Sequence, residues 1–237
     1  MSIHSSSLIR QYKTELFEQF ARVAKAMASE IRLEILDLLA QKEYNVESLA
    51  DMLGQSLQNI SRHLQILRQA KLVAIRKEGN FIYYRLSDED VSDLVATLQA
   101  VTHRHLSEVD EVLERFQSHA AEFEQVGLAE LVERAKSGDI VILDVRPASE
   151  FSNGHLPHAT NIPLMQLDRR LVELPINTPI VAYCRGKYCL LSYAAVDLLN
   201  AKGHSAKRMD EGIIEWKLER ISLVSTSGEL PVDVKSA

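Results

Sequence analysis

The spacing of apolar residues changes once along the chain, near residues 125–127, and this change most constrains the fold. Before it, apolar residues recur at helical spacing over long stretches; from Ile140 onward, short β-type runs alternate with helical segments. A chain of 237 residues is long enough for two domains of about 100 residues each. We therefore predict a first domain over 1–123, a second over 126–225 and a C-terminal tail over 226–237.

The first half has the cap and turn signals of a mainly-α domain with one hairpin. In chain order we expect helices over 8–27 and from Ser29 to Leu39, a short helix over 46–53 ended by Gly54, a helix over 57–69 begun by Ser56, strands over 72–77 and 81–86, and a long helix from Ser87 or Asp88 to about Phe123. A short helix, a tight turn, a capped helix and a hairpin in this order predict a winged helix-turn-helix, whose second helix enters the major groove of DNA.

A basic segment supports the same interpretation. The whole chain carries a net charge of −6, yet residues 56–85 hold six basic residues against a single acidic one. A basic island in an acidic domain is typical of a surface that approaches polyphosphate. Double-stranded operator DNA is the partner that this surface predicts.

Helical geometry indicates which side chains face that DNA. If Ile60, Leu64 and Leu67 face the core, the opposite side presents Gln58, Asn59, Ser61, Arg62, His63 and Gln65. Gln and Asn suit adenine edges, and Arg suits guanine or phosphate. We place Arg76 and Lys77 at the tip of the hairpin, where they would contact phosphate or the minor groove.

Three segments carry a resemblance to a known family. They are Met27-Ala28-Ser29-Glu30-Ile31-Arg32-Leu33-Glu34-Ile35-Leu36, Ser61-Arg62-His63-Leu64-Gln65-Ile66-Leu67, and Leu72-Val73 leading into Tyr83-Tyr84-Arg85-Leu86. Over roughly residues 10–105 the chain resembles the ArsR-type family of small dimeric repressors. The resemblance implies a homodimer in which the first and last helices pack across a two-fold axis.

Many members of that family sense metals, but the residues here favour no metal site. Residues 45–53 contain none of the cysteines that thiolate sensors of the family carry before the turn. Asp90 and His103 have the spacing of an interhelical zinc site, yet Ser92 and Leu106 at the companion positions do not complete tetrahedral ligation. We predict no metal and no cofactor, and His103, His105 and His119 as surface or dimer-face residues.

The second half carries three further motifs. They are Ile142-Leu143-Asp144-Val145-Arg146-Pro147 followed by Glu150-Phe151 and Gly154-His155-Leu156-Pro157, then Val181-Ala182-Tyr183-Cys184-Arg185-Gly186-Lys187-Tyr188-Cys189, and finally Gly212-Ile213-Ile214-Glu215-Trp216. Over about residues 126–222 the chain resembles the rhodanese family, which implies an α/β fold with a parallel sheet. In the family pattern Asp144, Arg146 and Glu150 brace the loop by ion pairing, a supporting role.

Cys184 is the predicted nucleophile. A thiol at the end of a central strand, before a loop that opens a helix, meets backbone N–H groups and a helix dipole that favour thiolate. Arg185 and Lys187 would add positive charge for an anionic sulfane-sulfur donor such as thiosulfate or a persulfide. Cys189, in the same loop, is either a partner in a disulfide or polysulfide, a second ligand for arsenite, or a spectator.

Phosphatase chemistry is disfavoured. The loop is about one residue longer than the usual rhodanese loop and so resembles that of related phosphatases and arsenate reductases. Their pattern is Cys, five residues, then Arg, and Leu190 stands at that Arg position here, so bidentate binding of a tetrahedral oxyanion is lost.

The cysteine count and the apolar runs indicate a cytoplasmic protein. The sequence has two cysteines, no apolar run of membrane-spanning length and no secretory signal in its first twenty residues. The combined prediction is a DNA-binding transcriptional repressor that senses reactive sulfur through Cys184. The alternatives are a sulfurtransferase enzyme tethered to a DNA-binding domain, and an arsenic-responsive regulator that uses Cys184 and Cys189.

Overall fold

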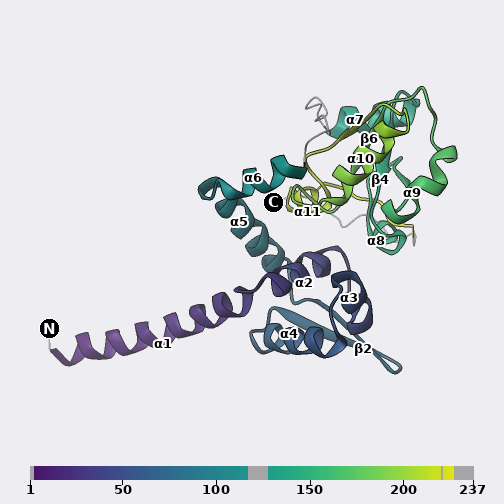
Figure 1. The fold of residues 1–237 in the computed structure, drawn as a ribbon. Coiled ribbons are helices and arrows are strands. Elements are labelled where there is room, and N and C mark those ends of the chain that lie inside the picture. The colour runs from purple at the N-terminus through teal and green to yellow at the C-terminus, as the bar shows by residue number, and fades with distance from the viewer. Residues whose placement is uncertain (1–2, 117–127, 220, 227–237) are drawn as a thin grey trace. The chain divides into compact units, whose positions relative to one another are not determined.

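The computed structural model describes residues 3–116, 128–219 and 221–226. Contacts divide the chain into two compact units, Met1–Leu98 and Gln99–Ala237, and each is described by itself. Figure 1 shows the order of the elements. The predicted domain limits at 123 and 126, and nearly all of the tail over 226–237, lie outside the described residues.

The first unit is a winged helix-turn-helix, as predicted. Its elements are α1 (Ile3–Met27), α2 (Glu30–Gln41), β1 (Tyr44–Asn45), α3 (Val46–Leu53), α4 (Leu57–Gln69), β2 (Val73–Glu78), β3 (Phe81–Leu86) and the beginning of α5 (Glu89–His105). The strands form an antiparallel sheet in the order β1-β3-β2. The two-residue strand β1, paired with β3, has no signal of its own in the sequence.

Local hydrogen bonds fix where α3 ends and α4 begins. Gly54 adopts the left-handed conformation (φ 61°, ψ 33°), which costs glycine little and stops α3. Two residues later the Ser56 hydroxyl accepts a hydrogen bond from the Asn59 amide at 3.2 Å. This N-cap satisfies a helix-end donor and starts α4, so the turn of the motif is set by its own residues.

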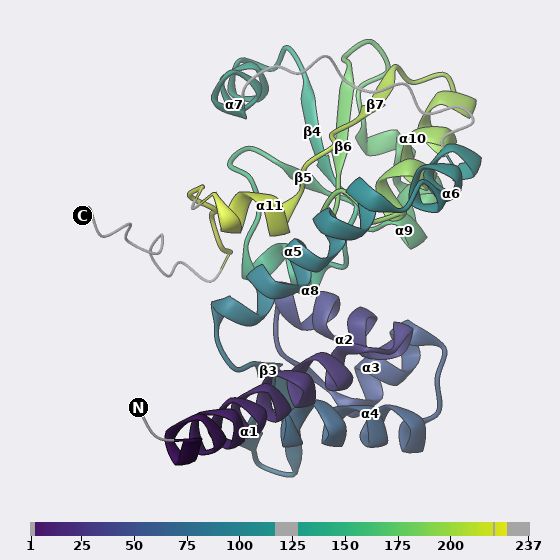
Figure 2. The same ribbon diagram turned by 90° about the vertical axis from the view of Figure 1, so that its left-hand side faces the viewer.

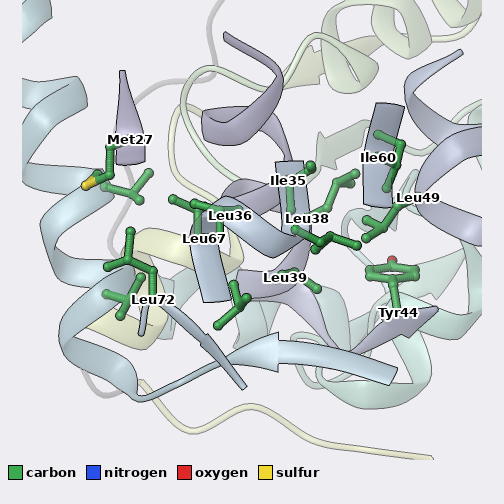
Figure 3. Close-up of a cluster of buried hydrophobic side chains, with 14 of the residues drawn as sticks. Met27, Ile35, Leu36, Leu38, Leu39, Tyr44, Leu49, Ile60, Leu67 and Leu72 are labelled. Carbon is green, nitrogen blue, oxygen red and sulfur yellow. The ribbon is translucent and has the colours of Figure 1, made fainter. Parts of the chain in front are cut away.

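One hydrophobic core holds the first unit together. Ile60, Leu64 and Leu67 of α4 are fully buried, as the helical spacing predicted. They join side chains of α2, α3 and β2 (Figure 3), among them Leu36 and Leu49. Burial of this apolar stripe leaves the opposite face of α4 to solvent.

The long helix predicted from Ser87 or Asp88 to about Phe123 is wrong as a single element. Asp88 caps its start by accepting a hydrogen bond from the Val91 amide at 3.2 Å, but α5 ends at His105 and α6 (Glu108–Phe116) begins after a break. Ser107 stands in the break, and serine favours helix ends over helix interiors. Residues 117–123 lie outside the described part of the chain.

The second unit contains the predicted α/β domain with a parallel sheet. Its elements after α6 are α7 (Leu128–Ser137), β4 (Val141–Asp144), α8 (Ala148–Asn153), β5 (Thr160–Asn161), α9 (Leu164–Arg170), η1 (Leu171–Glu173), β6 (Ile180–Tyr183), α10 (Leu191–Ala201), β7 (Ala206–Arg208) and α11 (Ile213–Leu218). The strand order is β5-β4-β6-β7, all parallel.

Successive residues of the central strands pack alternately into two hydrophobic cores, one on each face of this sheet. Leu143 and Ala182 belong to the core that α9 and α10 cover. Ile142 and Val181 belong to the core that includes Trp216 of α11 and a residue of α7, and Figure 2 shows α7 and α10 on either side of the strands. Strands buried on both faces explain the short continuous apolar runs in the sequence.

Within the described residues, the helices all fall short of the length and apolar character needed to cross a membrane.

Candidate functional site

The exposed face of α4 carries four of the eight residues predicted to contact DNA. Gln58, Ser61, Arg62 and Gln65 are exposed. They project from the side of the helix opposite its buried stripe, because the burial of Ile60, Leu64 and Leu67 fixes its rotation. The face therefore offers amide, hydroxyl and guanidinium groups, which are the chemistry for reading base edges.

Two of the predicted residues on α4 are half-buried. The Asn59 side-chain amide donates to Oε1 of Gln55 at 2.8 Å, which ties it to the turn of the motif. Nδ1 of His63 lies 3.4 Å from Nη1 of Arg32 on α2. Burial lowers the pKa of His63, and the charges of Arg32 and Arg62 lower it further, so a neutral imidazole is favoured at this position.

The hairpin places its two basic residues differently. Arg76 lies opposite Tyr83 within the hairpin, away from the turn at Gly79. Its guanidinium is paired with Glu43, with Nε 3.0 Å from both carboxylate oxygens, and with Glu78 at 2.8 Å. Lys77 is exposed. Of the two, Lys77 is the one whose charge is not already matched by carboxylates in the described structure.

The second site is a loop between β6 and α10 in the sheet of the second unit. Cys184 follows directly after β6 and is 2% exposed, and the loop continues to Leu190 before α10 begins. The chain thus brings the cysteine to the carboxyl end of a central parallel strand, where α/β sheets place their ligand sites.

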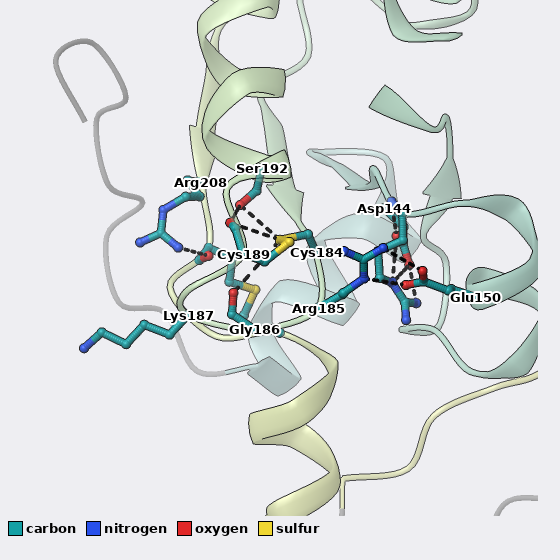
Figure 4. Close-up of a disulfide and its surroundings, with 12 residues drawn as sticks. Asp144, Glu150, Cys184, Arg185, Gly186, Lys187, Cys189, Ser192 and Arg208 are labelled. Atoms are coloured by element: carbon teal, nitrogen blue, oxygen red, sulfur yellow. Dashed lines mark hydrogen bonds and ion pairs between the residues drawn. A yellow bond between two sulfur atoms is a disulfide. The ribbon is translucent and has the colours of Figure 1, made fainter. Parts of the chain in front are cut away.

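Cys184 and Cys189 are joined by a disulfide within this loop, with Cα atoms 6.3 Å apart (Figure 4). The Sγ of Cys184 also lies 3.3 Å from the carbonyl oxygen of Cys189 and 3.5 Å from the hydroxyl of Ser192. Ser192, in the first turn of α10, is 1% exposed. The sulfur of Cys184 is therefore enclosed by its own loop and by the start of the helix.

Two ion pairs, each with a fully buried carboxylate, stand beside the loop. Arg185 donates to both carboxylate oxygens of Glu150 at 3.0 and 2.8 Å, and the Glu150 side chain is fully buried. Arg146 pairs with Asp144 at 2.6 Å and donates to the Gly154 carbonyl at 2.7 Å. Charge-assisted, two-point hydrogen bonds of this kind hold a guanidinium in a fixed orientation.

The basic side chains after Cys184 point to places other than the two sulfur atoms. The guanidinium of Arg185 faces Glu150, and Figure 4 shows the Lys187 side chain extending away from the disulfide. The backbone amide of Lys187 donates instead to Oε1 of Glu215 at 3.1 Å. In this disulfide-bonded structure the positive charge expected for a sulfur donor is thus not directed at Cys184.

Glu215 links the loop to α11. Its other carboxylate oxygen accepts from the Gly212 amide at 2.9 Å. Burial raises the pKa of Glu215, while the amide hydrogen bonds from Lys187 and Gly212 oppose that rise. The Ile214 amide also donates to the carbonyl of Arg185 at 2.8 Å, so the start of α11 is hydrogen-bonded to the loop.

Comparison with known proteins covers both units. The family description "Bacterial regulatory protein, arsR family" matches residues 29–74, and "Rhodanese-like domain" matches residues 127–219. The HTH-type transcriptional regulator Rv0324 of Mycobacterium tuberculosis is 42% identical over 206 residues, which cover 87% of this chain and 90% of that protein. The chain belongs to the ArsR family of bacterial regulatory proteins. It is an ArsR-family transcriptional regulator with a rhodanese-like domain.

Two further relatives of this ArsR-family regulator each cover less than half of the chain. The homodimeric winged helix-turn-helix DNA-binding domain Mb0332 of Mycobacterium bovis is 48% identical, covers 40% of this chain and 87% of its own, and has a TM-score of 0.38. The transcriptional activator HlyU of Vibrio cholerae is 40% identical over 74 residues, 31% of this chain and 68% of that protein.

Three residues that contact the cysteine loop of this regulator were not predicted to do so from the sequence. Ser192, which contacts Cys184, was not assigned a place at the site, and Glu215 was seen only as part of the Gly212–Trp216 motif, without its contact to the loop. His103, expected at the surface or at a dimer face, is half-buried against Tyr188. Among the described residues, no group of three His, Cys, Asp or Glu side chains is arranged to hold a metal ion.

Proposed function

We propose that this ArsR-family regulator is a homodimeric, DNA-binding repressor that senses reactive sulfur through Cys184 and Cys189. The observation that carries the proposal is the pairing of these two cysteines in one loop, since the chain has no others. If a thiol is the sensor, it lies in this loop. The exposed polar face of α4 supports DNA binding, and the homodimeric Mycobacterium bovis domain supports the assembly.

The sulfur chemistry takes two balanced steps. The Cys184 thiolate attacks the sulfane sulfur of a persulfide donor, the donor's S–S bond breaks, and the donor leaves as a thiolate while Cys184 becomes a persulfide. The Cys189 thiolate then attacks Sγ of Cys184, hydrosulfide leaves, and the disulfide forms. The persulfide donor is the oxidant for the two cysteines, so no other reagent is required.

The loop geometry favours a sensor over an enzyme with continuous turnover. Cys189 stands in the same loop as Cys184, with the two Cα atoms 6.3 Å apart. A neighbouring thiol competes with external acceptors at a high effective concentration. We therefore expect the persulfide to be converted into the disulfide before sulfur is passed on, and the disulfide state to lower operator affinity.

The test treats the full chain with glutathione persulfide and measures two quantities. Mass spectrometry of the peptide that holds Cys184 and Cys189 reports sulfur loading, and binding to a duplex selected from a random pool by the reduced protein reports DNA affinity. A decrease of about tenfold, or 1.4 kcal/mol, is expected for the wild type and none for Cys184→Ser. An equal decrease in Cys184→Ser would overturn the proposal.

Cys189→Ser separates the sensor from the enzyme. Without the resolving thiol, Cys184 is expected to keep its persulfide and to transfer sulfur to added thiols faster than the wild type. If the wild type already turns over thiosulfate or persulfide efficiently, with no effect of sulfur state on DNA affinity, the second unit is a sulfurtransferase. Tight arsenite binding that both serine variants lose would instead indicate an arsenic-responsive regulator, because two close thiolates suit a thiophilic ion.

A further inference from the structure

The cysteine loop contacts a helix that the rhodanese-like fold does not contain. Tyr188 lies between Lys187 and Cys189, and its hydroxyl is 3.0 Å from Nδ1 of His103 near the end of α5. The two rings meet edge to face, with centroids 5.6 Å apart and an angle of 78° between their planes. Both residues belong to the second unit, which begins at Gln99.

A second partner fixes the His103 ring. Its Nε2 lies 2.7 Å from Oδ1 of Asp110 on α6. When Nε2 donates to this carboxylate, Nδ1 is the ring nitrogen left to accept from the Tyr188 hydroxyl. Burial raises the pKa of Tyr188, and the charges of Glu215 and Asp110 raise it further, so its phenol stays protonated as a donor.

Tyr188 stands directly beside a cysteine that is held in a disulfide. The side chain of Cys189 is held by the disulfide to Cys184, and its amide donates to the Gly186 carbonyl at 3.0 Å. The disulfide therefore constrains the backbone on which Tyr188 stands. When both thiols are free this covalent constraint is absent, and the hydroxyl is no longer held toward His103 by it.

The helix that His103 occupies also belongs to the DNA-binding unit. α5 runs without interruption from Glu89 to His105. Val91 and Val95 near its start are buried in the core of the first unit. A contact made at His103 thus acts on an element whose other end is part of the winged helix-turn-helix core.

We propose that the hydrogen bond between Tyr188 and His103 couples the sulfur state of the Cys184–Cys189 loop to α5 and through it to DNA affinity. The disulfide state makes this contact and the dithiol state releases it. The inference rests on the proposed sulfur-sensing function and names the residues that connect the sensor to the DNA-binding unit. Tyr188 and His103 are positioning residues, because neither touches the sulfur atoms.

The test uses the full chain with three substitutions. Tyr188→Phe keeps the ring and removes the hydroxyl; His103→Gln removes the imidazole; His105→Gln changes an exposed histidine of the same helix end as a matched control. Each protein is compared before and after glutathione persulfide for disulfide formation, by mass spectrometry, and for affinity toward the selected duplex. Circular dichroism checks that each variant is folded.

All four proteins are expected to form the disulfide. The wild type and His105→Gln should lose about tenfold in DNA affinity, whereas Tyr188→Phe and His103→Gln should change by less than about threefold. A readout independent of DNA is the ring nitrogen NMR shift of His103, which should differ between dithiol and disulfide states in the wild type and not in Tyr188→Phe.

Two results would overturn this coupling, and they differ from each other. If Tyr188→Phe loses affinity as the wild type does, the contact is not the link, although sulfur sensing stands. If the wild type forms the disulfide without any change in affinity, the sensing function fails and the coupling fails with it. Should His103→Gln be unstable, Tyr188→Phe and the NMR shift decide the question alone.

Discussion

Gly212 is where a single added methyl group should disturb the cysteine loop most. Its φ of −149° is open to any residue, so backbone strain is not the issue. A Cβ atom at this position would lie 2.5 Å from the Cys184 carbonyl oxygen, 2.6 Å from the Gly186 nitrogen and 2.8 Å from the Arg185 carbonyl carbon. All three are backbone atoms, so the loop or the start of α11 has to move.

We expect Gly212→Ala to destabilise the second unit by about 1–3 kcal/mol, the usual cost of overpacking a close-packed site. Gly154→Ala is the matched control, because a Cβ there would meet only the Leu223 side chain, at 3.6 Å, which is ordinary contact. Both substitutions reduce the conformational entropy of the unfolded chain similarly. The difference between their free energies of unfolding therefore reports the steric clash at position 212.

Denaturant unfolding followed by tryptophan fluorescence measures this difference in the relevant unit. Trp216 is the only tryptophan in the sequence, is fully buried and belongs to the second unit. Free energies of unfolding of Gly212→Ala and Gly154→Ala that agree within about 0.5 kcal/mol would refute the steric argument.

Three further predictions concern the DNA-binding unit. Arg62→Gln should weaken binding to the selected duplex by about 1–3 kcal/mol and relax preference at one base position, measured against a panel of single-base variants. Lys77→Gln should weaken binding to all DNA sequences alike and reduce the slope of log affinity against log salt concentration by about 1. Arg76→Gln should change that slope less, because Glu43 and Glu78 already neutralise Arg76, and equal slopes for the two variants would contradict this. Since burial and neighbouring arginines lower the pKa of His63 in the folded state, the unfolded chain binds more protons as pH falls below about 6.5, so stability should drop there and drop less in His63→Gln, as followed by circular dichroism.

Features that depend on neighbouring residues in sequence could be predicted. Gly54 and Ser56 mark the ends of α3 and α4 because each acts on backbone groups a few residues away. The burial of Ile60 follows from helical spacing alone. Cys184 could be placed at the end of a strand because the apolar run over Ile180–Tyr183 stops there.

Contacts between side chains that are far apart in the sequence could not be predicted. Arg76 was expected to face DNA, yet its guanidinium is paired with Glu43, which is 33 positions away. Many acidic residues are available to any arginine, and hydrophobic spacing does not select among them. The hydrogen bond from Tyr188 to His103, 85 positions apart, is unpredictable for the same reason, although both residues were visible in the sequence.

In the proposed mechanism, the cysteine loop suits a switch more than a catalyst with continuous turnover. Transfer of sulfur from a Cys184 persulfide to an outside thiol is a reaction between two molecules, so its rate depends on the concentration of that thiol. Attack by Cys189 requires only motion within one loop, because their Cα atoms lie 6.3 Å apart. The internal reaction ends in a disulfide that persists until a reductant removes it, and that state constrains the backbone next to Tyr188. A lasting covalent state beside a helix shared with the DNA-binding core is what a transcriptional response needs, whereas a catalyst needs the loop to return to its thiol at every turnover.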